Sequence, residues 1–503
     1  MLKHIGSSWL LTILQIVAML KLTPFMAERL GTESYGVWLE IVALTGALKL
    51  LIAGVPMASV RFLSAALGRK DLDEVRRVVS TCFAMCVGLG ALAFSVGGAA
   101  SVYFTGTFLE KPTVAVLGVG ESAALAYWVV VASVAMGFVM RLPYGILEAY
   151  HDFHHRNAIM AAELLLRFLL SIGLLMHDAS IEVLAFAMIF SQVVEFVVAL
   201  GIVKLRHPEV HFGLAHYDRT LLRSILGFSL FTLLLNMGAQ LAFRADALVI
   251  GEFLSDPAAI ADYDFGNKFF EYLIALVLGI GMVVMPYATR LRAEGDSSDL
   301  GGVFLKYSKM ALSLSLCVGL YLLVLGPEFL AWWLQDQYHP RSGVVTQILM
   351  LSFFAFLPIR GVALPMLMGL GEPRKPAIAF LGMGVLNVAL SVALIGPYGL
   401  VGVALGTAIP NVLFAGYVLK LACAEIHVPV TQYLRHVFGR ALVGSLVPLG
   451  FLAWCKWGLD LQGFVPVFGA GAVMVGVFAL TWIFFVYRGD PDYDLPALIR
   501  RKL

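Results

Sequence analysis

SAALAYWVVVASVAMGFVMRLPYGILE, residues 122–148, is the stretch that best predicts the fold of this chain. It carries no charged residue from Ser122 to Met140. A helix of about 20 apolar residues can cross a hydrocarbon core of roughly 30 Å, whereas a barrel strand needs only about ten alternating residues. The stretch therefore predicts a transmembrane helix, with one cation, Arg141, near its end.

Runs of this kind recur from one end of the chain to the other. Of its 503 residues, 60% are hydrophobic and 14% are charged, and its mean hydropathy is +0.88. Soluble domains have about a quarter of their residues charged, so we predict an all-α polytopic membrane protein. About fourteen transmembrane helices are expected, at residues 8–28, 36–60, 78–104, 122–148, 157–176, 181–203, 224–251, 263–289, 304–326, 343–369, 376–395, 399–423, 438–457 and 464–487.

The basic residues are distributed unevenly between the two sides of these helices. If the N-terminus is cytoplasmic, 24 of the 35 Lys and Arg residues fall in inner loops and tails and four in outer loops. Because cytoplasmic loops retain Lys and Arg, both termini are expected inside. The first run lacks a small-residue cleavage site, so it is predicted to be a retained helix. The outer loops are too short for the acceptor-binding domain that a membrane polymerase or glycosyltransferase needs.

The two halves of the chain match each other at constant offsets. An offset of 230 places residues 36–60 over 263–289 and pairs Gly36 with Gly266, Pro56 with Pro286, Ala58 with Ala288 and Ser59 with Thr289. An offset of 219 places residues 122–148 over 343–369 and pairs Arg141 with Arg360, Arg156 with Lys375, Ala158 with Ala377 and Ile159 with Ile378. The matched helices are six helices apart in the chain, so both halves should enter the membrane from the same side.

This duplication predicts the domain organisation. We expect two parallel-repeat six-helix bundles that form a V-shaped central cavity, followed by two C-terminal helices. The expected parts are an N-terminal bundle at 1–205, a cytoplasmic linker at 206–223, a C-terminal bundle at 224–425, and two further helices with a cytoplasmic tail at 426–503.

Four phrases carry a resemblance to a known family. They are TPFMAERLGTESYGVW (23–38), GVPMASVRFLSAALGRKD (54–71), RADALVIGEFL (244–254) and GLGEPRKPAI (369–378). Together with the repeat, they make the chain resemble the polysaccharide transporters of the multidrug/oligosaccharidyl-lipid/polysaccharide exporter superfamily. That group includes the O-antigen flippases and, more distantly, the bacterial lipid II flippase.

The resemblance implies a function without bond chemistry. Similar proteins flip undecaprenyl-pyrophosphate-linked oligosaccharides across the bacterial cytoplasmic (inner) membrane by alternating access, without a cofactor. The expected partners are this anionic lipid-linked sugar, membrane lipid and polysaccharide-assembly enzymes, with no nucleic acid, and the chain is expected to work as a monomer. Two alternatives remain: an ion-coupled multidrug exporter of the same superfamily, and a membrane-embedded polymerase or transferase.

Seven basic residues lie inside the predicted helices. Each Lys or Arg near the bilayer centre costs roughly 2.5 to 3.5 kcal/mol unless it faces water, a partner or a ligand, so a water-filled interior that receives an anion is indicated. The seven taken as embedded, with those near the helix ends assigned to the loops, are Lys21, Lys49, Arg141, Arg167, Arg244, Lys268 and Arg360.

Lys21, Lys49 and Lys268 lie on the helices whose basic residues line the cavity in the lipid II flippase. Lys21 and Lys49 have no carboxylate three or four residues away, so they are substrate-binding candidates. A pair with an acid on another helix, such as Glu40, is the alternative. Lys268 has Asp264 four residues away, so a local ion pair competes with ligand binding.

The four arginines are predicted to have different roles. Arg244 follows Asn236 and Gln240 on one helix face, which indicates a water-facing stripe and a binding role. Arg141 and Arg360 are repeat mates near cytoplasmic helix ends, where they could guide a phosphate or hold a gate. Arg167 is predicted to form a structural pair, with Glu163 at i−4.

Four embedded acids are candidates for proton or sodium coupling: Asp246, Glu40, Glu271 and Glu163. Membrane potential acting on an anionic substrate is the alternative. Cytoplasmic histidines have a spacing that could hold zinc, but no cysteine accompanies them, so no metal is expected. These histidines are His151, His154, His155, His207, His211 and His216.

Overall fold

The computed structural model is built of helices, and no strand occurs in the part of the chain that it describes. This confirms the all-α polytopic class. The described residues are 2–52, 55–150, 152–210, 212–254, 256–294, 300–459, 461 and 463–490.

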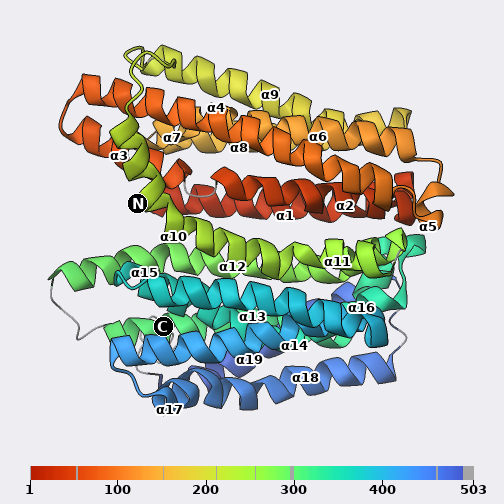
Figure 1. Cartoon of the computed structure of the whole chain (residues 1–503). Coiled ribbons are helices and arrows are strands. Elements are labelled where there is room, and N and C mark those ends of the chain that lie inside the picture. The colour runs from red at the N-terminus through yellow and green to blue at the C-terminus, as the bar shows by residue number, and fades with distance from the viewer. Residues whose placement is uncertain are drawn as a thin grey trace. The chain divides into compact units, whose positions relative to one another are not determined.

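Contacts between residues divide the chain into two compact units, Met1–Ala261 and Asp262–Leu503. Within each unit the helices run roughly parallel or antiparallel to one another (Figure 1). The first unit contains α1 Leu2–Leu30, α2 Thr32–Leu48, η1 Lys49–Ile52, α3 Val55–Gly68, α4 Leu72–Tyr103, η2 Phe104–Phe108, α5 Pro112–Ala115, α6 Gly120–Met140, α7 Leu142–Ala149, α8 Phe153–His177, α9 Ile181–Arg206, α10 Arg219–Phe243 and α11 Ala245–Phe253.

The second unit begins within α12 and contains the helices that follow it. α18 and α19, the two C-terminal helices, pack against α13 and against each other. The elements are α12 Pro257–Glu294, α13 Leu300–Leu334, η3 Gln335–Gln337, α14 Pro340–Pro358, η4 Ile359–Ala363, α15 Leu364–Gly369, α16 Arg374–Ile426, α17 Val430–Tyr433, η5 Leu434–Gly439, α18 Arg440–Gly458, α19 Phe464–Thr481 and η6 Trp482–Val486.

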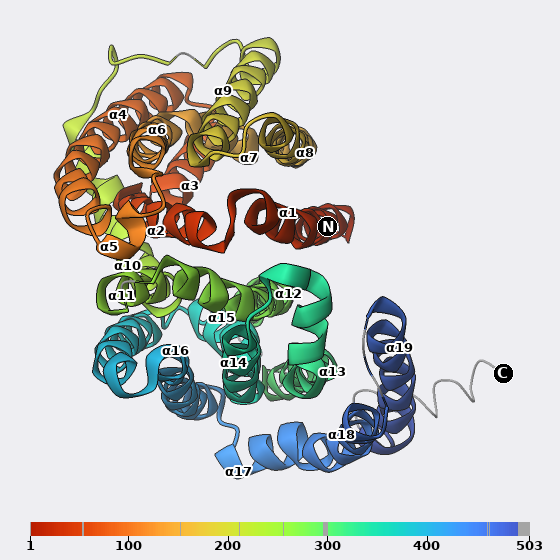
Figure 2. The same ribbon diagram turned by 90° about the vertical axis from the view of Figure 1, so that its right-hand side faces the viewer.

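Helix α6 lies inside the first unit and packs against α4, α9 and α2 (Figure 2). Small residues allow α4 to approach closely, since a Cβ on Gly90 would lie 2.7 Å from the backbone oxygen of Ala135. Tyr127 is buried and donates a 2.7 Å hydrogen bond to the backbone oxygen of Gly97. The predicted helix 122–148 is interrupted at Arg141, and Pro143 at the start of α7 cannot continue the hydrogen-bond ladder.

The predicted count of fourteen spans is not confirmed. Among the described residues, eleven helices are long and apolar enough to cross a membrane, or up to twelve if α10 and α11 form one bent span. α1 is not among them, and α16, with 53 residues, counts once.

α16 nevertheless contains two antiparallel segments, as the runs 376–395 and 399–423 predict. Gly399 breaks it with φ 56° and ψ −135°, a conformation that only glycine adopts readily. Beyond the break, Gly402 and Gly406 pack directly on Leu394 and Ser391, with no space for side chains.

Replacing Gly399 by alanine is expected to destabilise the protein by about 1–3 kcal/mol, because a Cβ strains this backbone conformation. Thermal unfolding of the detergent-solubilised protein measures the effect. Gly396→Ala is the control, since nothing lies within 4 Å of a Cβ there and its φ is not positive. Equal unfolding temperatures for both variants would contradict the role of Gly399.

The repeat mates Ser59 and Thr289 each lie against a glycine of a neighbouring repeat helix within their own units. A Cβ on Gly145 in α7 would lie 3.1 Å from the hydroxyl of Ser59 in α3. In the second unit, Thr289, the mate of Ser59, donates a 3.0 Å hydrogen bond from α12 to the backbone oxygen of Gly369 in α15. Both units therefore use a small residue to bring the same two repeat helices together.

Candidate anion-binding site

Lys49 lies at a break in the second predicted helix. α2 ends at Leu48 and η1 begins with Lys49, whose side chain is exposed although it belongs to an apolar span. Three residues earlier, Gly46 lies against α10: a Cβ there would be 2.9 Å from the amide nitrogen of Gln240. Gln240 of the polar stripe on α10 thus lies close to the end of α2 that precedes Lys49.

Arg244 lies at a second break. It separates α10 from α11, and the chain bends there by 41°. Its side chain is exposed, and Gln240 lies one turn before it on the same face of α10. A bend of this size interrupts the backbone ladder and allows the long side chain to leave the helix surface.

Lys49 is close enough to three other embedded cations for their charges to act on it. The charge of Lys49 interacts with those of Arg141, Arg167 and Arg244, and all four residues belong to the first unit. We call these residues the cation cluster. Lys49, Arg141 and Arg244 are exposed, and Arg167 is partly exposed. Like charges inside apolar helices repel one another, so an anion would stabilise the arrangement.

Two carboxylates border the cation cluster. Glu163 forms the predicted pair with Arg167, at 3.5 Å, and accepts a 3.1 Å hydrogen bond from Ser191. Glu195 accepts a hydrogen bond from Tyr144, and its charge interacts with those of Arg141 and Arg167. Both acids lie beside arginines of the cation cluster, so they offset part of its positive charge.

The other three predicted binding residues lie elsewhere. Lys21 is exposed on α1 of the first unit. Lys268 forms the local ion pair with Asp264 at 2.8 Å, which was the competing interpretation. Arg360 lies in the π-helical turn η4, with its guanidinium 4.9 Å from the ring centre of Phe380.

The structure distinguishes the four coupling candidates by their surroundings. Glu40 is fully buried, and neither of its carboxyl oxygens has a hydrogen-bond partner among the described residues. Asp246 is also buried, whereas Glu271 is partly exposed and Glu163 is paired with Arg167.

The loop histidines contact acids of the first unit. His207 lies 2.9 Å from Asp152, which also accepts two hydrogen bonds from Arg206. Burial acts to raise the pKa of Asp152, but the bonds from His207 and Arg206 outweigh it and hold this pKa below its usual range. No group of three metal-ligating side chains occurs in the described ranges, while His151 and His211 lie outside them.

Sequence reasoning missed two residues of this site. Arg167 was predicted only to form a structural pair with Glu163, yet its charge also acts on Lys49. Tyr144, which binds Glu195, carries no local signal, because the two residues are 51 positions apart in the chain. The position of Arg167 near the middle of an apolar run was the available indication of a role beyond pairing.

Apolar spans in two compact units, with exposed cations inside those of the first, define a multi-pass membrane protein. The chain belongs to the polysaccharide biosynthesis protein family, whose model matches residues 30–342. It is also similar to the uncharacterized membrane protein EpsK of Bacillus subtilis. The two are 24% identical over 448 residues, which cover 86% of this chain and 85% of EpsK.

Two solved structures share the fold. A multidrug resistance MATE family transporter in an inward-facing conformation matches with a TM-score of 0.71 and 17% identity, covering 82% of this chain and 94% of that one. The lipid II flippase MurJ, in an inward closed conformation, has the same TM-score at 13% identity and covers 96% of this chain and 99% of its own. These likenesses confirm the predicted fold, and the family model confirms the predicted family.

Proposed function

We propose that this protein is a flippase that moves an undecaprenyl-pyrophosphate-linked oligosaccharide across the bacterial cytoplasmic membrane by alternating access. The observation that carries the proposal is the cation cluster, in which Lys49, Arg141 and Arg244 are exposed within apolar helices. A pyrophosphate needs countercharge at membrane depth, and these residues supply it.

The chemistry of the substrate calls for such a path. Each unpaired sugar hydroxyl costs roughly 2 to 7 kcal/mol on transfer to hydrocarbon, so the head group requires a polar route. Nothing in this route needs a bond to be made or broken, so the protein acts as a transporter without catalysis. Lys21, Lys268 and Arg360 remain proposed as further contacts for the substrate along that route.

A multidrug exporter of the same superfamily is the second candidate, since a MATE transporter shares the fold. Organic cations bind best where negative charge prevails. The four bases of the cation cluster favour an anionic substrate instead.

Mass spectrometry of lipid extracts from a deletion strain tests the proposed function. We expect a complete lipid-linked oligosaccharide to accumulate, and the wild-type gene to restore its export. Accumulation of an unextended precursor would indicate a transferase or polymerase. Unchanged lipids, together with raised sensitivity to organic cations, would indicate a drug exporter.

We also propose an orientation and setting. Both termini lie in the cytoplasm, as the excess of basic residues in the inner loops indicates. The protein works as a monomer beside the enzymes that assemble the polysaccharide. Cysteine labelling from either side of the membrane at exposed positions in the loops tests the orientation.

Among the coupling candidates, we propose Glu40 as the proton-binding group. An ionised carboxylate without a hydrogen-bond donor is costly in a dry site, so Glu40 is expected to hold a proton in this conformation. Gly251 of α11 lies against it, since a Cβ there would be 2.8 Å from Oε2. Releasing the proton would place an uncompensated charge between α2 and α11 and loosen their packing.

Glu40→Gln is expected to lower export about tenfold, because the amide keeps the neutral shape but cannot release a proton. Glu40→Asp, which can still titrate, should retain more export at equal expression. Surface polysaccharide and membrane protein levels are measured together. Full export by Glu40→Gln would rule out Glu40 as the proton-binding group. Export that survives dissipation of both ion gradients would leave membrane potential as the driving force.

A further inference from the structure

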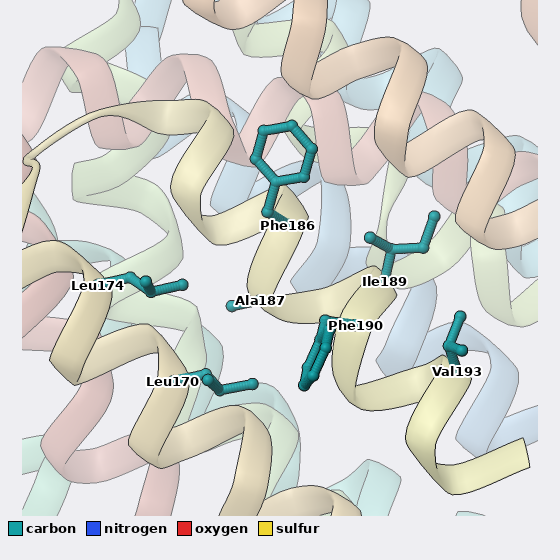
Figure 3. A pocket seen from close by; sticks show the side chains of 7 residues that line it. All are labelled: Leu170, Leu174, Phe186, Ala187, Ile189, Phe190 and Val193. Atoms are coloured by element: carbon teal, nitrogen blue, oxygen red, sulfur yellow. The ribbon is translucent and has the colours of Figure 1, made fainter. Parts of the chain in front are cut away.

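An apolar groove lies on α8 and α9 of the first unit. It has a volume of about 510 Å³. Figure 3 shows Leu170 and Leu174 extending from α8 toward α9, where Phe190 and Ala187 face them. The residues that line it are Leu170, Leu174, Phe186, Ala187, Ile189, Phe190 and Val193, and all have hydrocarbon side chains.

The α8 wall of the groove leads to the cation cluster. Glu163, Arg167, Leu170 and Leu174 are spaced as i, i+4, i+7 and i+11, so they form one stripe on α8. Arg167 thus lies one turn from the groove, and its side chain is 33% exposed. The stripe changes from charged to apolar along a single helix face.

The depth of Arg167 in the membrane distinguishes between possible occupants. Arg167 precedes the end of α8 at His177 by ten residues, or about 15 Å of helix, which is about half the thickness of the hydrocarbon core. An ordinary phospholipid keeps its head group at the interface, so its phosphate does not reach this depth. The phosphate of an amphiphile reaches this depth only when the cation cluster attracts it away from the interface.

We propose that the α8–α9 groove binds the polyprenyl tail of the lipid-linked substrate while Arg167 contacts its phosphate. The inference rests on the proposed function, and it gives Arg167 a role beyond its pair with Glu163. That pair uses Nε of the guanidinium, and a guanidinium has further N–H donors on its two other nitrogens that suit a phosphate. The tail remains in apolar surroundings while the sugar follows the polar path.

Photo-cross-linking tests the groove. The full chain, with the photoreactive residue p-benzoylphenylalanine in place of Phe190, is reconstituted in phospholipid nanodiscs with radiolabelled undecaprenyl pyrophosphate. A matched variant carries the same residue at Val475 of α19, which is also exposed to lipid. We expect saturable labelling at position 190, at least tenfold above that at position 475.

Two further variants fill the groove at its ends. Leu174→Trp and Val193→Trp should each reduce labelling at position 190 at least threefold while the protein still elutes as a single species. Arg167→Ala should weaken labelling, and Arg167→Lys should restore part of it. Cross-links to phospholipid alone, or equal labelling at positions 190 and 475, would overturn the proposal.

The cross-linking result and the lipid analysis of the deletion strain test the groove and the proposed function separately. If position 190 is not labelled but the deletion strain accumulates the complete lipid-linked oligosaccharide, the groove assignment fails and the flippase stands. If position 190 is labelled but no such intermediate accumulates, the site for the lipid tail stands and the proposed transport reaction fails.

Discussion

Export of surface polysaccharide is expected to fall at least tenfold when Lys49 or Arg244 is replaced by alanine. Both side chains are exposed inside apolar helices, and the charge of Lys49 acts on that of Arg244. A hydrogen bond to a charged group contributes about 1.5–3 kcal/mol, which corresponds to roughly ten- to a hundredfold in affinity. The measurement is surface polysaccharide per cell at matched protein levels.

Charge-conserving and distant variants complete this experiment. Lys49→Arg and Arg244→Lys should recover part of the export, because countercharge remains while the geometry changes. Lys420→Ala removes an exposed cation near the end of α16 and should leave export unchanged. Undiminished export in both alanine variants would count heavily against the cation cluster as the substrate site.

Replacing Lys309 by alanine is expected to destabilise the protein by about 3–5 kcal/mol, the usual cost of leaving a buried charge unpaired. Lys309 was counted with the inner loops, but it is buried in α13 and pairs with the buried Asp490. It also donates a 3.2 Å hydrogen bond to the backbone oxygen of Val486. This pair attaches the segment that follows α19 to α13.

Thermal unfolding in detergent measures the loss, and an exposed pair serves as the control. Arg69→Ala breaks a pair with Glu74 in which the arginine is 60% exposed, and should cause no measurable change. Combining Lys309→Met with Asp490→Leu should regain much of the lost stability, since no buried charge remains. A Lys309→Ala protein as stable as the wild type would show that the pair does not anchor the C-terminal helices.

The architecture was accessible from sequence because lipid imposes a simple requirement. Every backbone polar group in hydrocarbon must be satisfied within its own segment, so long apolar runs become helices. The positions of breaks were less accessible. The run at 122–148 was predicted as one helix, yet it breaks at Arg141, and the bend at Arg244 depends on how α10 and α11 pack against other helices of the unit.

The candidate site was only partly accessible. The cost of an embedded charge identified all seven cations, and the i−4 spacing correctly paired Arg167 with Glu163. Local spacing could not show that the charges of Arg141, Arg167 and Arg244 act on Lys49, because these residues come from four separate helical segments. Nor could it show that Arg360 stacks on Phe380.

By itself, the sequence determined that this protein is a helical membrane transporter with an internal repeat and cations inside its apolar spans, because hydropathy and the cost of charge depend on composition along one helix. Tertiary structure decided which cations share a site, which acid lacks a partner and where an apolar groove meets an arginine. Those properties depend on distances between segments far apart in the chain, and folding alone sets such distances.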